Sequence, residues 1–427
     1  MRIRLDPVKV LAAGIAVRWF GISFYTPFIL LYIHTELGVP LSVAGLYIAL
    51  VALFALPIPI LGGGLADRYG RRRVVLLSLL AEAGGIGWLA LSMWLSTLLA
   101  VLFALFVVMV AGIIGSPANS AYIADSTEPT NRAKAFAWQR VGQNTGFTTG
   151  IALGGVLLSL FPYWQVAEYA AIVASAGAIF MFCFLPPAPH DRVLAGRRGQ
   201  PSSDGGKTAT ASLRQRAASG FSVFWNPLRV LRADRSLLLF WIGSILVWLL
   251  VLQYTYAVPT FARMSLGVSY AIIGIALAIN GIIPALTQVP MTHALTGRRL
   301  TTVGIWGIGS YAVAFLALGL LAVHPSVVVP ALFAMVVVMT LGENLVSVAG
   351  TTIPMNLAPE EARGAYAGAV YFGGSIGSIT APILAGLALS WATQPLLTWI
   401  VLALPAIPAT GIFLALQSRL SVSQNTV

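Results

Sequence analysis

Long apolar runs alternate with short polar segments along the whole chain. Most runs extend for 20 or more residues, and at 1.5 Å per residue such a helix crosses a hydrocarbon layer of about 30 Å. Backbone polar groups inside a bilayer must be satisfied internally, and the alternating pattern of a membrane barrel does not occur, so the runs predict helices. We expect twelve, at residues 10–34, 41–66, 74–95, 97–124, 132–161, 165–186, 236–262, 269–296, 300–323, 326–356, 363–391 and 393–417.

The composition supports a membrane protein. Of the 427 residues, 58% are hydrophobic and only 9% are charged, whereas a soluble domain carries about 25% charged residues. So few charges cannot cover a water-exposed surface of this size. We therefore expect an all-α integral membrane protein that crosses the bilayer many times.

The basic residues predict the orientation. The net charge is +12, and all but three of the 25 Lys and Arg residues fall in the two terminal tails or in alternate loops. The exceptions are Arg18 and Arg140, within helices, and Arg263, in a loop of the opposite set. This asymmetry is the positive-inside rule and predicts two cytoplasmic termini. We expect membrane lipid as a partner, no nucleic acid, and a bacterial cytoplasmic membrane as the location.

Few side chains offer chemistry for catalysis or metal binding. Cys183 is the only cysteine, which excludes a disulfide framework within the chain. The histidines lie far apart, with a spacing that suits no metal site, and no nucleophile–base constellation appears. We expect no enzyme, no cofactor and no metal. The histidines are His34, His190, His293 and His324.

The second half of the chain repeats the first. A shift of 231 residues aligns Gly146 with Gly377 and Gly155 with Gly386, as in transporters built from parallel repeats. We expect two six-helix bundles, 1–186 and 236–427, joined by a cytoplasmic linker at 187–235. Within the linker, apolar and basic residues alternate over 213–235, which fits either an interfacial helix on anionic lipid or a solvated connector.

The segment Gly63-Gly-Gly-Leu-Ala-Asp67-Arg68-Tyr-Gly70-Arg71-Arg72-Arg73 is the most specific motif. Gly63 and its neighbour Gly64 would permit close helix approach, and Gly70 a tight turn. The pattern resembles the loop between helices 2 and 3 of the major facilitator superfamily of transporters. The resemblance implies twelve helices, a central cavity lined by helices 1, 4, 7 and 10, and a conformational latch. The latch residues expected are Gly63, Asp67, Arg68, Gly70, Arg71, Arg72, Asp125 and Arg132.

The glycines of residues 142–155 form a smooth helix face suited to close packing. The stretch resembles the antiporter signature of the same family, although Ile151 stands where that signature has proline. The segment Ala381-Pro382-Ile-Leu-Ala385-Gly386 keeps the proline. Residues 97–124 lack the arginine that many drug–proton antiporters carry in helix 4. Ordinary helix packing and antiport are both open at this point.

Four charges lie within predicted helices, where each costs about 2.5–3.5 kcal/mol at mid-bilayer unless it has a partner, water or a function. Glu343 is the first candidate for a proton carrier, because Thr340-Leu-Gly-Glu343-Asn344 resembles helix 10 of proton-linked exporters. Arg140 resembles the Arg-x-x-x-Asn-x-Gly face of such exporters. Its expected partner is an acid, with Glu82 and Asp125 as candidates, or a helix C-terminus. The proton-coupling set is Glu343, Glu82, Arg18 and Arg140.

Further polar and aromatic side chains in the predicted helices are candidates for substrate binding. They are Tyr25, Asn119, Gln143, Asn144, Gln253, Tyr254, Tyr256, Asn280 and Asn344. Pro27 and Pro259, close to Tyr25 and Tyr256, weaken helix hydrogen bonding and permit bending. Helix packing is the competing role for every residue of this set.

The expected function is export of a small amphipathic organic compound, driven by the proton gradient as energy source. A monomer with alternating access to a midplane cavity is expected. Two alternatives remain from the sequence: an uptake symporter for a sugar or organic acid, and a lipid flippase of the same fold. The motifs specify a fold rather than a substrate.

Overall fold

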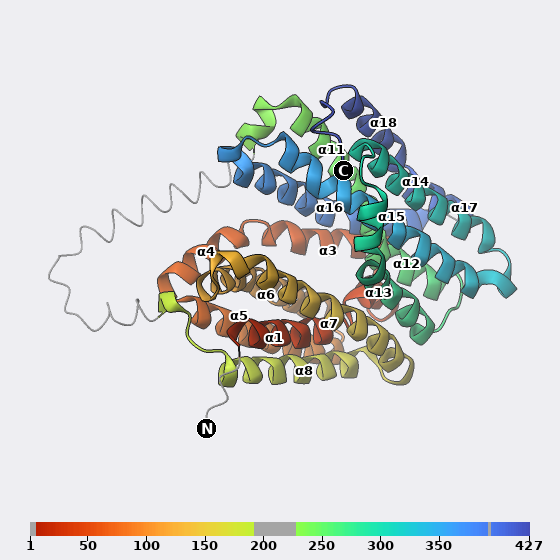
Figure 1. Cartoon of the computed structure of the whole chain (residues 1–427). Coiled ribbons are helices and arrows are strands. Elements are labelled where there is room, and N and C mark those ends of the chain that lie inside the picture. The colour runs from red at the N-terminus through yellow and green to blue at the C-terminus, as the bar shows by residue number, and fades with distance from the viewer. Residues whose placement is uncertain (1–5, 192–227, 392–393) are drawn as a thin grey trace. The chain divides into compact units, whose positions relative to one another are not determined.

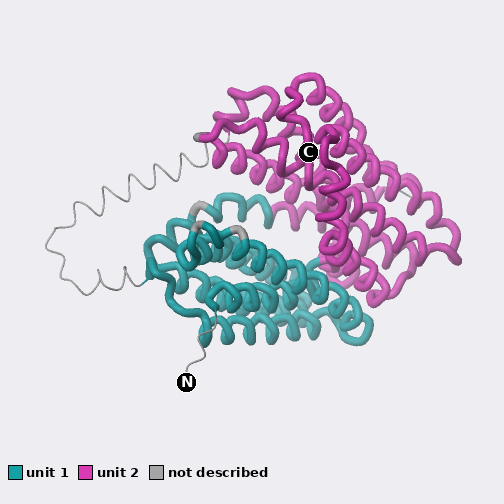
Figure 2. Tube along the Cα trace, viewed as in Figure 1, with its two compact units in different colours: residues 1–26, 51–221 teal, residues 27–50, 222–427 magenta. Residues whose placement is uncertain are grey.

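A computed structural model describes residues 6–191, 228–391 and 394–427. In these ranges the regular structure is helical, apart from one isolated bridge between Arg299 and Thr426. Contacts between residues divide the chain into two compact units (Figures 1 and 2). Unit 1 comprises residues 1–26 and 51–221, and unit 2 comprises residues 27–50 and 222–427.

Unit 1 contains α1 and α4–α8, and takes the last residues of α3. The bounds are α1 Pro7–Ile22, α4 Ile58–Tyr69, α5 Arg71–Trp94, α6 Leu98–Ser126, a short turn η2 Pro129–Asn131, α7 Arg132–Leu160 and α8 Tyr163–Phe184. Helices α1, α5, α6, α7 and α8 pack against one another as neighbours within this unit.

Unit 2 contains α2, most of α3, and the helices from α11 onward. The bounds are η1 Thr26–Phe28, α2 Ile29–Thr35, α3 Leu41–Ala55, α11 Arg235–Val251, α12 Gln253–Met264, α13 Tyr270–Ala294, α14 Leu300–Leu321, η3 Pro325–Val327, α15 Val328–Leu357, η4 Glu360–Ala362, α16 Arg363–Trp391, α17 Pro395–Ala403 and α18 Ala406–Gln417.

The predicted class, an all-α membrane protein, is confirmed. Among the described residues, ten helical stretches are long and apolar enough to cross a membrane. The other two expected spans are also helical: residues 41–66 fold as the shorter α3 and α4, and residues 132–161 fold as α7. The number of twelve crossings and the cytoplasmic termini stay predictions.

Several expected spans are interrupted. The first breaks between α1 and η1, just before Pro27, as the proline suggested. The seventh, however, breaks at Leu252, whereas Pro259 lies inside α12. A proline without an N–H weakens a helix but need not end it when packing holds both sides. Further breaks at Pro57 and Pro405 separate α3 from α4 and α17 from α18.

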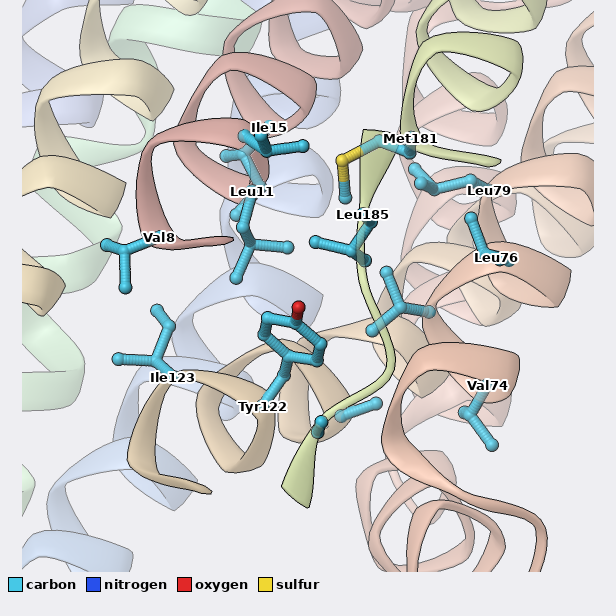
Figure 3. Packing of buried hydrophobic residues seen from close by; sticks show 14 of the residues in the cluster. Val8, Leu11, Ile15, Val74, Leu76, Leu79, Tyr122, Ile123, Met181 and Leu185 are labelled. Atoms are coloured by element: carbon cyan, nitrogen blue, oxygen red, sulfur yellow. The ribbon is translucent and has the colours of Figure 1, made fainter. Parts of the chain in front are cut away.

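The core of unit 1 lies where α1, α5, α6 and the end of α8 meet (Figure 3). Leu11 and Ile15 from α1 and Tyr122 from α6 are buried there. Met181 from α8 fills the space beside Gly14, because a Cβ atom on Gly14 would lie 2.2 Å from the methionine sulfur. This packing joins four helices that are distant in sequence.

Helices α1 and α7 approach each other through glycine. A Cβ atom on Gly146 would lie 2.1 Å from the carbonyl oxygen of Ala16, so no side chain fits. Gly142 and Gly150 meet the α1 backbone in the same way, and Gly154 meets the backbone of Phe24, just after α1. In the repeat-related pair α11 and α16, Gly377 instead faces Trp248. The two repeats therefore use their aligned glycines differently, for backbone contact in one and for a tryptophan in the other.

Residues 27–50 pack against α16 within unit 2. A Cβ atom on Gly45 would lie 2.2 Å from the carbonyl oxygen of Pro382, and one on Gly386 would lie 2.3 Å from that of Leu41. The backbone N–H of Ser42 also donates to the hydroxyl of Ser390 at 3.0 Å. The Gly386 side of the Ala381–Gly386 segment is thus a helix-packing surface.

Part of the predicted linker lies outside the described residues. This includes most of the alternating segment 213–235. From Leu228 to Ala233 the chain is helical, and Leu231 is buried against Leu237, Tyr366 and Ala369. For residues 213–227, which lie outside the described ranges, an interfacial helix and a solvated connector both stay predictions.

Candidate functional site

Arg18 and Glu82 form a buried ion pair between α1 and α5. Nε of Arg18 donates to Oε2 of Glu82 at 2.5 Å, and Nη2 donates to Oε1 at 2.6 Å. The side chain of Glu82 is 3% exposed and that of Arg18 is 17% exposed. The planar guanidinium satisfies both carboxylate oxygens at once, the geometry that makes such pairs strong. Glu82 on the third predicted span is therefore turned inward and neutralised.

Gly112 on α6 makes room for this pair. A Cβ atom on Gly112 would lie 2.4 Å from Nη2 of Arg18 and 2.8 Å from Oε1 of Glu82. Three helices of unit 1 thus enclose the two charges. The prediction that Arg140 pairs with Glu82 or Asp125 differs from the structure, because these acids bind Arg18 and Arg71 instead. Two nitrogen atoms of Arg18 bind both oxygens of Glu82, so this pair already satisfies the carboxylate.

Glu343 on α15 has a different environment. Nδ2 of Asn280, on α13, donates to Oε2 of Glu343 at 2.7 Å and also lies 3.1 Å from the hydroxyl oxygen of Thr340. Within the described part of the chain, no Lys, Arg or His forms an ion pair with Glu343. Its hydrogen-bond donor is a neutral amide, so no cation among the described residues compensates its negative charge.

Other predicted substrate residues of unit 2 bond to neighbouring helices. Asn344 is buried and donates to the hydroxyl of Thr287 at 2.8 Å. Gln253 is fully buried, and its amide donates to the carbonyls of Leu249 and Ala381. The hydroxyl of Tyr254 donates to the carbonyl of Leu277. These contacts are those expected of helix packing, and of this set only Asn280 meets Glu343.

In unit 1, α7 carries Arg140 and Asn144 on an exposed face, with Gln143 partly buried beside them. Within the described residues, Arg140 takes part in no ion pair. Asn119 on α6 has a buried Oδ1 without a hydrogen-bond partner in this part of the chain. Tyr25 is buried and interacts electrostatically with both members of the Arg18–Glu82 pair. Tyr256, on α12 of unit 2, is partly buried.

The loop motif forms a charge network between α4, α5 and α6. Arg71 donates through Nε to Asp125 at 2.8 Å and through Nη1 to Asp67. Arg72 caps the end of α8, with bonds of 2.5 Å to the carbonyl of Leu185 and 2.7 Å to that of Phe182. Arginine side chains commonly satisfy the last carbonyls of a helix in this way.

Two other arginines of the expected latch set make weaker contacts. Arg132 donates to the carbonyl of Ala124 at 3.2 Å. The guanidinium of Arg68 lies 5.3 Å from the ring centroid of Tyr69. The acid of the motif, Asp67, pairs with Arg71 of the same motif.

The close helix approach expected at Gly63 and Gly64 is found one residue earlier. A Cβ atom on either would meet no atom within 4 Å, whereas one on Gly62 would lie 2.7 Å from the carbonyl oxygen of Ile114. The expectation named the wrong glycines. With three consecutive glycines, the sequence does not show which of them faces the neighbouring helix. Gly70 has φ = +102°, as a tight turn requires.

The sequence did not reveal two residues of these networks, Asp191 and Asn425. The carboxylate of Asp191 accepts the backbone N–H groups of Arg71 and Arg72, and the side chain of Asn425 accepts that of Thr301. Both partners are backbone atoms more than a hundred residues away. One feature of the sequence indicates an outside cap. Gly70, at the start of α5, has no side chain with which to cap the helix, so another residue must bind the first N–H groups.

The two glutamates differ in the chemistry they allow. The carboxylate of Glu82 is held by the guanidinium of Arg18, and its removal would leave a buried arginine unpaired. A carboxyl group with a single neutral donor can take up and release a proton without stranding a countercharge. Among the described residues no group of three His, Cys, Asp or Glu side chains is arranged to hold a metal. Proton exchange at Glu343 is the reaction this arrangement permits.

Comparison with known proteins agrees with this architecture. The family model of the Major Facilitator Superfamily matches residues 11–382 and again residues 263–424. The uncharacterized MFS-type transporter YttB of Bacillus subtilis (strain 168) is 26% identical over 381 residues, 89% of this chain and 87% of the relative. The Na(+), Li(+), K(+)/H(+) antiporter of Planococcus maritimus is 26% identical, over 84% of this chain and 83% of its own.

Two further similarities extend over nearly the whole chain. The multidrug resistance protein MdtH of Aeromonas salmonicida (strain A449) is 23% identical, over 90% of this chain and 91% of its own. A crystal structure of a POT family transporter in complex with 5-aminolevulinic acid superposes with a TM-score of 0.73 at 14% identity. The superposition covers 96% of this chain and 95% of that one. At such low identity it shows a shared fold.

Proposed function

Because the chain belongs to the Major Facilitator Superfamily, we propose that it is a proton-coupled antiporter that exports a small amphipathic organic compound. The family resemblance drawn from residues 63–73 is confirmed, and the chain is a multi-pass membrane transporter rather than an enzyme. We further propose the cytoplasmic membrane of a bacterium as its location, since the relatives named above are bacterial.

The single observation that carries the proposal is the environment of Glu343. It is a carboxyl group within a membrane-spanning helix, bonded to the Asn280 amide and without a cation partner in the described residues. An intramembrane acid of this kind is costly unless it is protonated or used. The intramembrane acid of unit 1, Glu82, is by contrast paired with Arg18.

Coupling follows from competition at Glu343. Two six-helix bundles, 1–186 and 236–427, would expose a central cavity to each side in turn. When the cavity faces outside, a proton binds Glu343 and the substrate leaves. When it faces the cytoplasm, the substrate binds and the proton leaves. Exchange of this kind links the two equilibria through one coupling free energy. The antiporter and multidrug resistance relatives support exchange and export.

The proposal is tested with purified protein in liposomes. Ethidium, a permanently charged amphipathic cation, serves as the probe, because its distribution does not follow the pH gradient passively. Potassium with valinomycin clamps the membrane potential at zero. An antiporter accumulates ethidium in liposomes with an acidic interior and releases protons as it does so. Protein-free liposomes under the same gradient are the control.

The same preparation separates the alternatives. A sugar or an organic acid that accumulates only when the interior is alkaline identifies a symporter and ends the export proposal. Movement of a fluorescent phospholipid between leaflets, with no flux of any soluble probe in either gradient, identifies a flippase. Each outcome requires a different direction of proton movement or none, so the three functions cannot give the same result.

Glu343→Gln tests the residue that carries the proposal. The glutamine keeps the shape and the contact to Asn280 but cannot exchange a proton, so gradient-driven accumulation should fall to the level of protein-free liposomes. Glu168→Gln, an exposed glutamate on α8, is the matched control and should transport normally. Undiminished proton-driven accumulation in Glu343→Gln would remove Glu343 from the coupling step.

A further inference from the structure

The first turn of α5 is capped by a residue from the chain segment that follows α8. Oδ1 of Asp191 accepts the backbone N–H of Arg71 at 2.6 Å, and Oδ2 accepts that of Arg72 at 3.1 Å. The residue that precedes the helix, Gly70, offers no side chain, and a Cβ atom there would lie 2.6 Å from Oδ1 of Asp191. Asp191 therefore occupies the position that a capping side chain would take.

The first turn of α14 is capped in a similar way by the segment that follows α18. The backbone N–H of Leu300 donates to the main-chain carbonyl of Asn425 at 2.8 Å, and that of Thr301 donates to Oδ1 of Asn425 at 2.9 Å. Nδ2 of Asn425 donates in turn to the hydroxyl of Thr301 at 3.0 Å. Asn425 is only 3% exposed, although it lies beyond the last helix.

These two arrangements occur at similar places in the two halves of the chain. Asp191 lies 120 residues after Arg71, and Asn425 lies 124 residues after Thr301. In both cases the capped helix follows a glycine with positive φ, Gly70 at +102° and Gly297 at +82°. We propose that residues 185–191 and 418–427 are equivalent straps, called here the first and the second strap, and that Asp191 and Asn425 are the positioning residues through which each strap holds the third span of its half.

Each strap also binds the fourth span of its half. In the first strap, the carbonyl of Pro186 accepts the hydroxyl of Tyr122, on α6, at 2.7 Å. In the second, the carbonyl of Gln424 accepts Nδ2 of Asn356, on α15, at 3.3 Å. A strap thus ties the ends of two adjacent helices together. In both halves a strap contacts the third and the fourth span, although the contacting residues differ. The shared feature is therefore the connection of these three segments.

The second strap has additional backbone anchors. The N–H of Val427 donates to the carbonyl of Arg298 at 2.9 Å, and the N–H of Gly297 donates to the carbonyl of Val427 at 3.3 Å. These bonds hold the turn between α13 and α14. In unit 1 the corresponding turn carries the Asp67–Arg71 pair, whereas Ala294 stands in place of that acid in unit 2. The second strap supplies the fixation that the missing ion pair would have given.

The helices that the straps hold adjoin the two glutamates. Helix α5 carries Glu82 itself. Helix α14 contacts α15 beside Glu343, where a Cβ atom on Gly342 would lie 2.9 Å from the carbonyl oxygen of Gly307. The consequence for transport rests on the proposed function: loss of a strap should lower the maximal transport rate several-fold and leave the half-saturating substrate concentration unchanged, because neither strap contacts the glutamates.

The test is hydrogen–deuterium exchange of the purified chain, read by mass spectrometry on peptides that begin α5 and α14. Asn425→Ala removes the side-chain acceptor, and exchange of the first amides of α14 should become about fivefold faster, the effect expected for loss of one helix cap. Asn425→Asp keeps an oxygen at the same place and should exchange like the unchanged protein. For α5, Asp191→Ala removes both acceptor oxygens and Asp191→Asn keeps one of the two, so exchange of the first amides of α5 should accelerate most in Asp191→Ala and less in Asp191→Asn.

A control variant shows that the effect is local. Ser269→Ala removes the side-chain cap of α13, where the hydroxyl accepts the N–H of Ile272, and should leave α5 and α14 unchanged. If both alanine variants fail to fold while Asn425→Asp and Asp191→Asn fold normally, the straps are supported as well. Unchanged exchange in both alanine variants, or equal acceleration in the alanine and the conservative variants, would overturn the inference. Exchange does not depend on substrate flux, so this result stands apart from the proposed function.

Discussion

The guanidinium of Arg18 meets the carboxylate of Glu82 through two parallel bonds, of 2.5 Å and 2.6 Å. The pair joins the first and third spans of the chain at a point closed on a third side by Gly112. Two opposite charges that leave water together are costly to bury, and their mutual attraction roughly offsets that cost. The consequences of removing one charge or both are therefore expected to differ sharply.

Removal of Glu82 alone should destabilise the protein strongly. In Glu82→Leu the buried guanidinium of Arg18 loses its partner, and the free energy of unfolding should fall by about 3–5 kcal/mol. Unfolding in mixed detergent micelles, followed by circular dichroism, measures this change. The double variant Arg18→Met/Glu82→Leu removes both charges and should recover most of the loss. A double variant less stable than Glu82→Leu would contradict this account.

Gly146 should be intolerant of any side chain. In Gly146→Ala the new methyl group would start 2.1 Å from the carbonyl oxygen of Ala16, and neither backbone can move without disturbing α1 or α7. We expect a loss of about 1–3 kcal/mol in the free energy of unfolding. Gly364→Ala is the matched control, since its Cβ atom meets no atom within 4 Å and alanine favours a helix. Equal losses in both variants would show that space at α1 is not the cause.

The positions of the helices could be predicted because apolar runs bounded by charges leave little choice inside a membrane. Their interruptions could not. Pro27 follows a break, but Pro259 lies within α12, and the break occurs at Leu252 instead. Whether a proline bends or ends a helix depends on the neighbours that satisfy the freed carbonyl groups. Those neighbours come from other helices and leave no local pattern.

The candidate site was predictable in its charged residues but only partly in their partners. Glu343 was expected from its position within an apolar run, and so was an arginine for Glu82. That the arginine is Arg18 depends on packing through Gly112. Asp191 and Asn425 were missed because they bind backbone N–H groups, which every residue type offers. The residue type that supplies a backbone N–H therefore does not reveal that the group is hydrogen-bonded.

Arg71 should not tolerate lysine. Its guanidinium donates to Asp125 at 2.8 Å and also to Asp67, a bridge that a single ammonium group cannot reproduce in the same plane. Because the site is partly exposed, the loss in unfolding free energy should be modest, about 1 kcal/mol. Arg73→Lys, at an exposed arginine of the same motif, should change nothing. A loss in Arg73→Lys equal to that in Arg71→Lys would argue for general charge effects.

The last prediction concerns the amide that contacts Glu343. In Asn280→Leu the carboxylate loses the 2.7 Å donor that stabilises its charged form, so protonation should occur at lower proton concentration. The midpoint of the pH dependence of ethidium transport should then move to higher pH, because a hydrogen bond to the charged form is lost. The measurement is initial uptake into liposomes across a pH series at a constant pH difference.

Asn344→Leu provides the control for that shift. The side chain of Asn344, the residue after Glu343, joins the same two helices through its bond to Thr287 and forms no hydrogen bond with the Glu343 carboxylate among the described residues. Its loss should therefore lower stability without moving the pH midpoint. If both variants move the midpoint equally, the shift reports loosened packing between α13 and α15. If Asn280→Leu transports with an unchanged midpoint, the carboxyl group of Glu343 is not the group whose protonation limits transport, since its hydrogen-bond environment would then have no effect on the proton-dependent step.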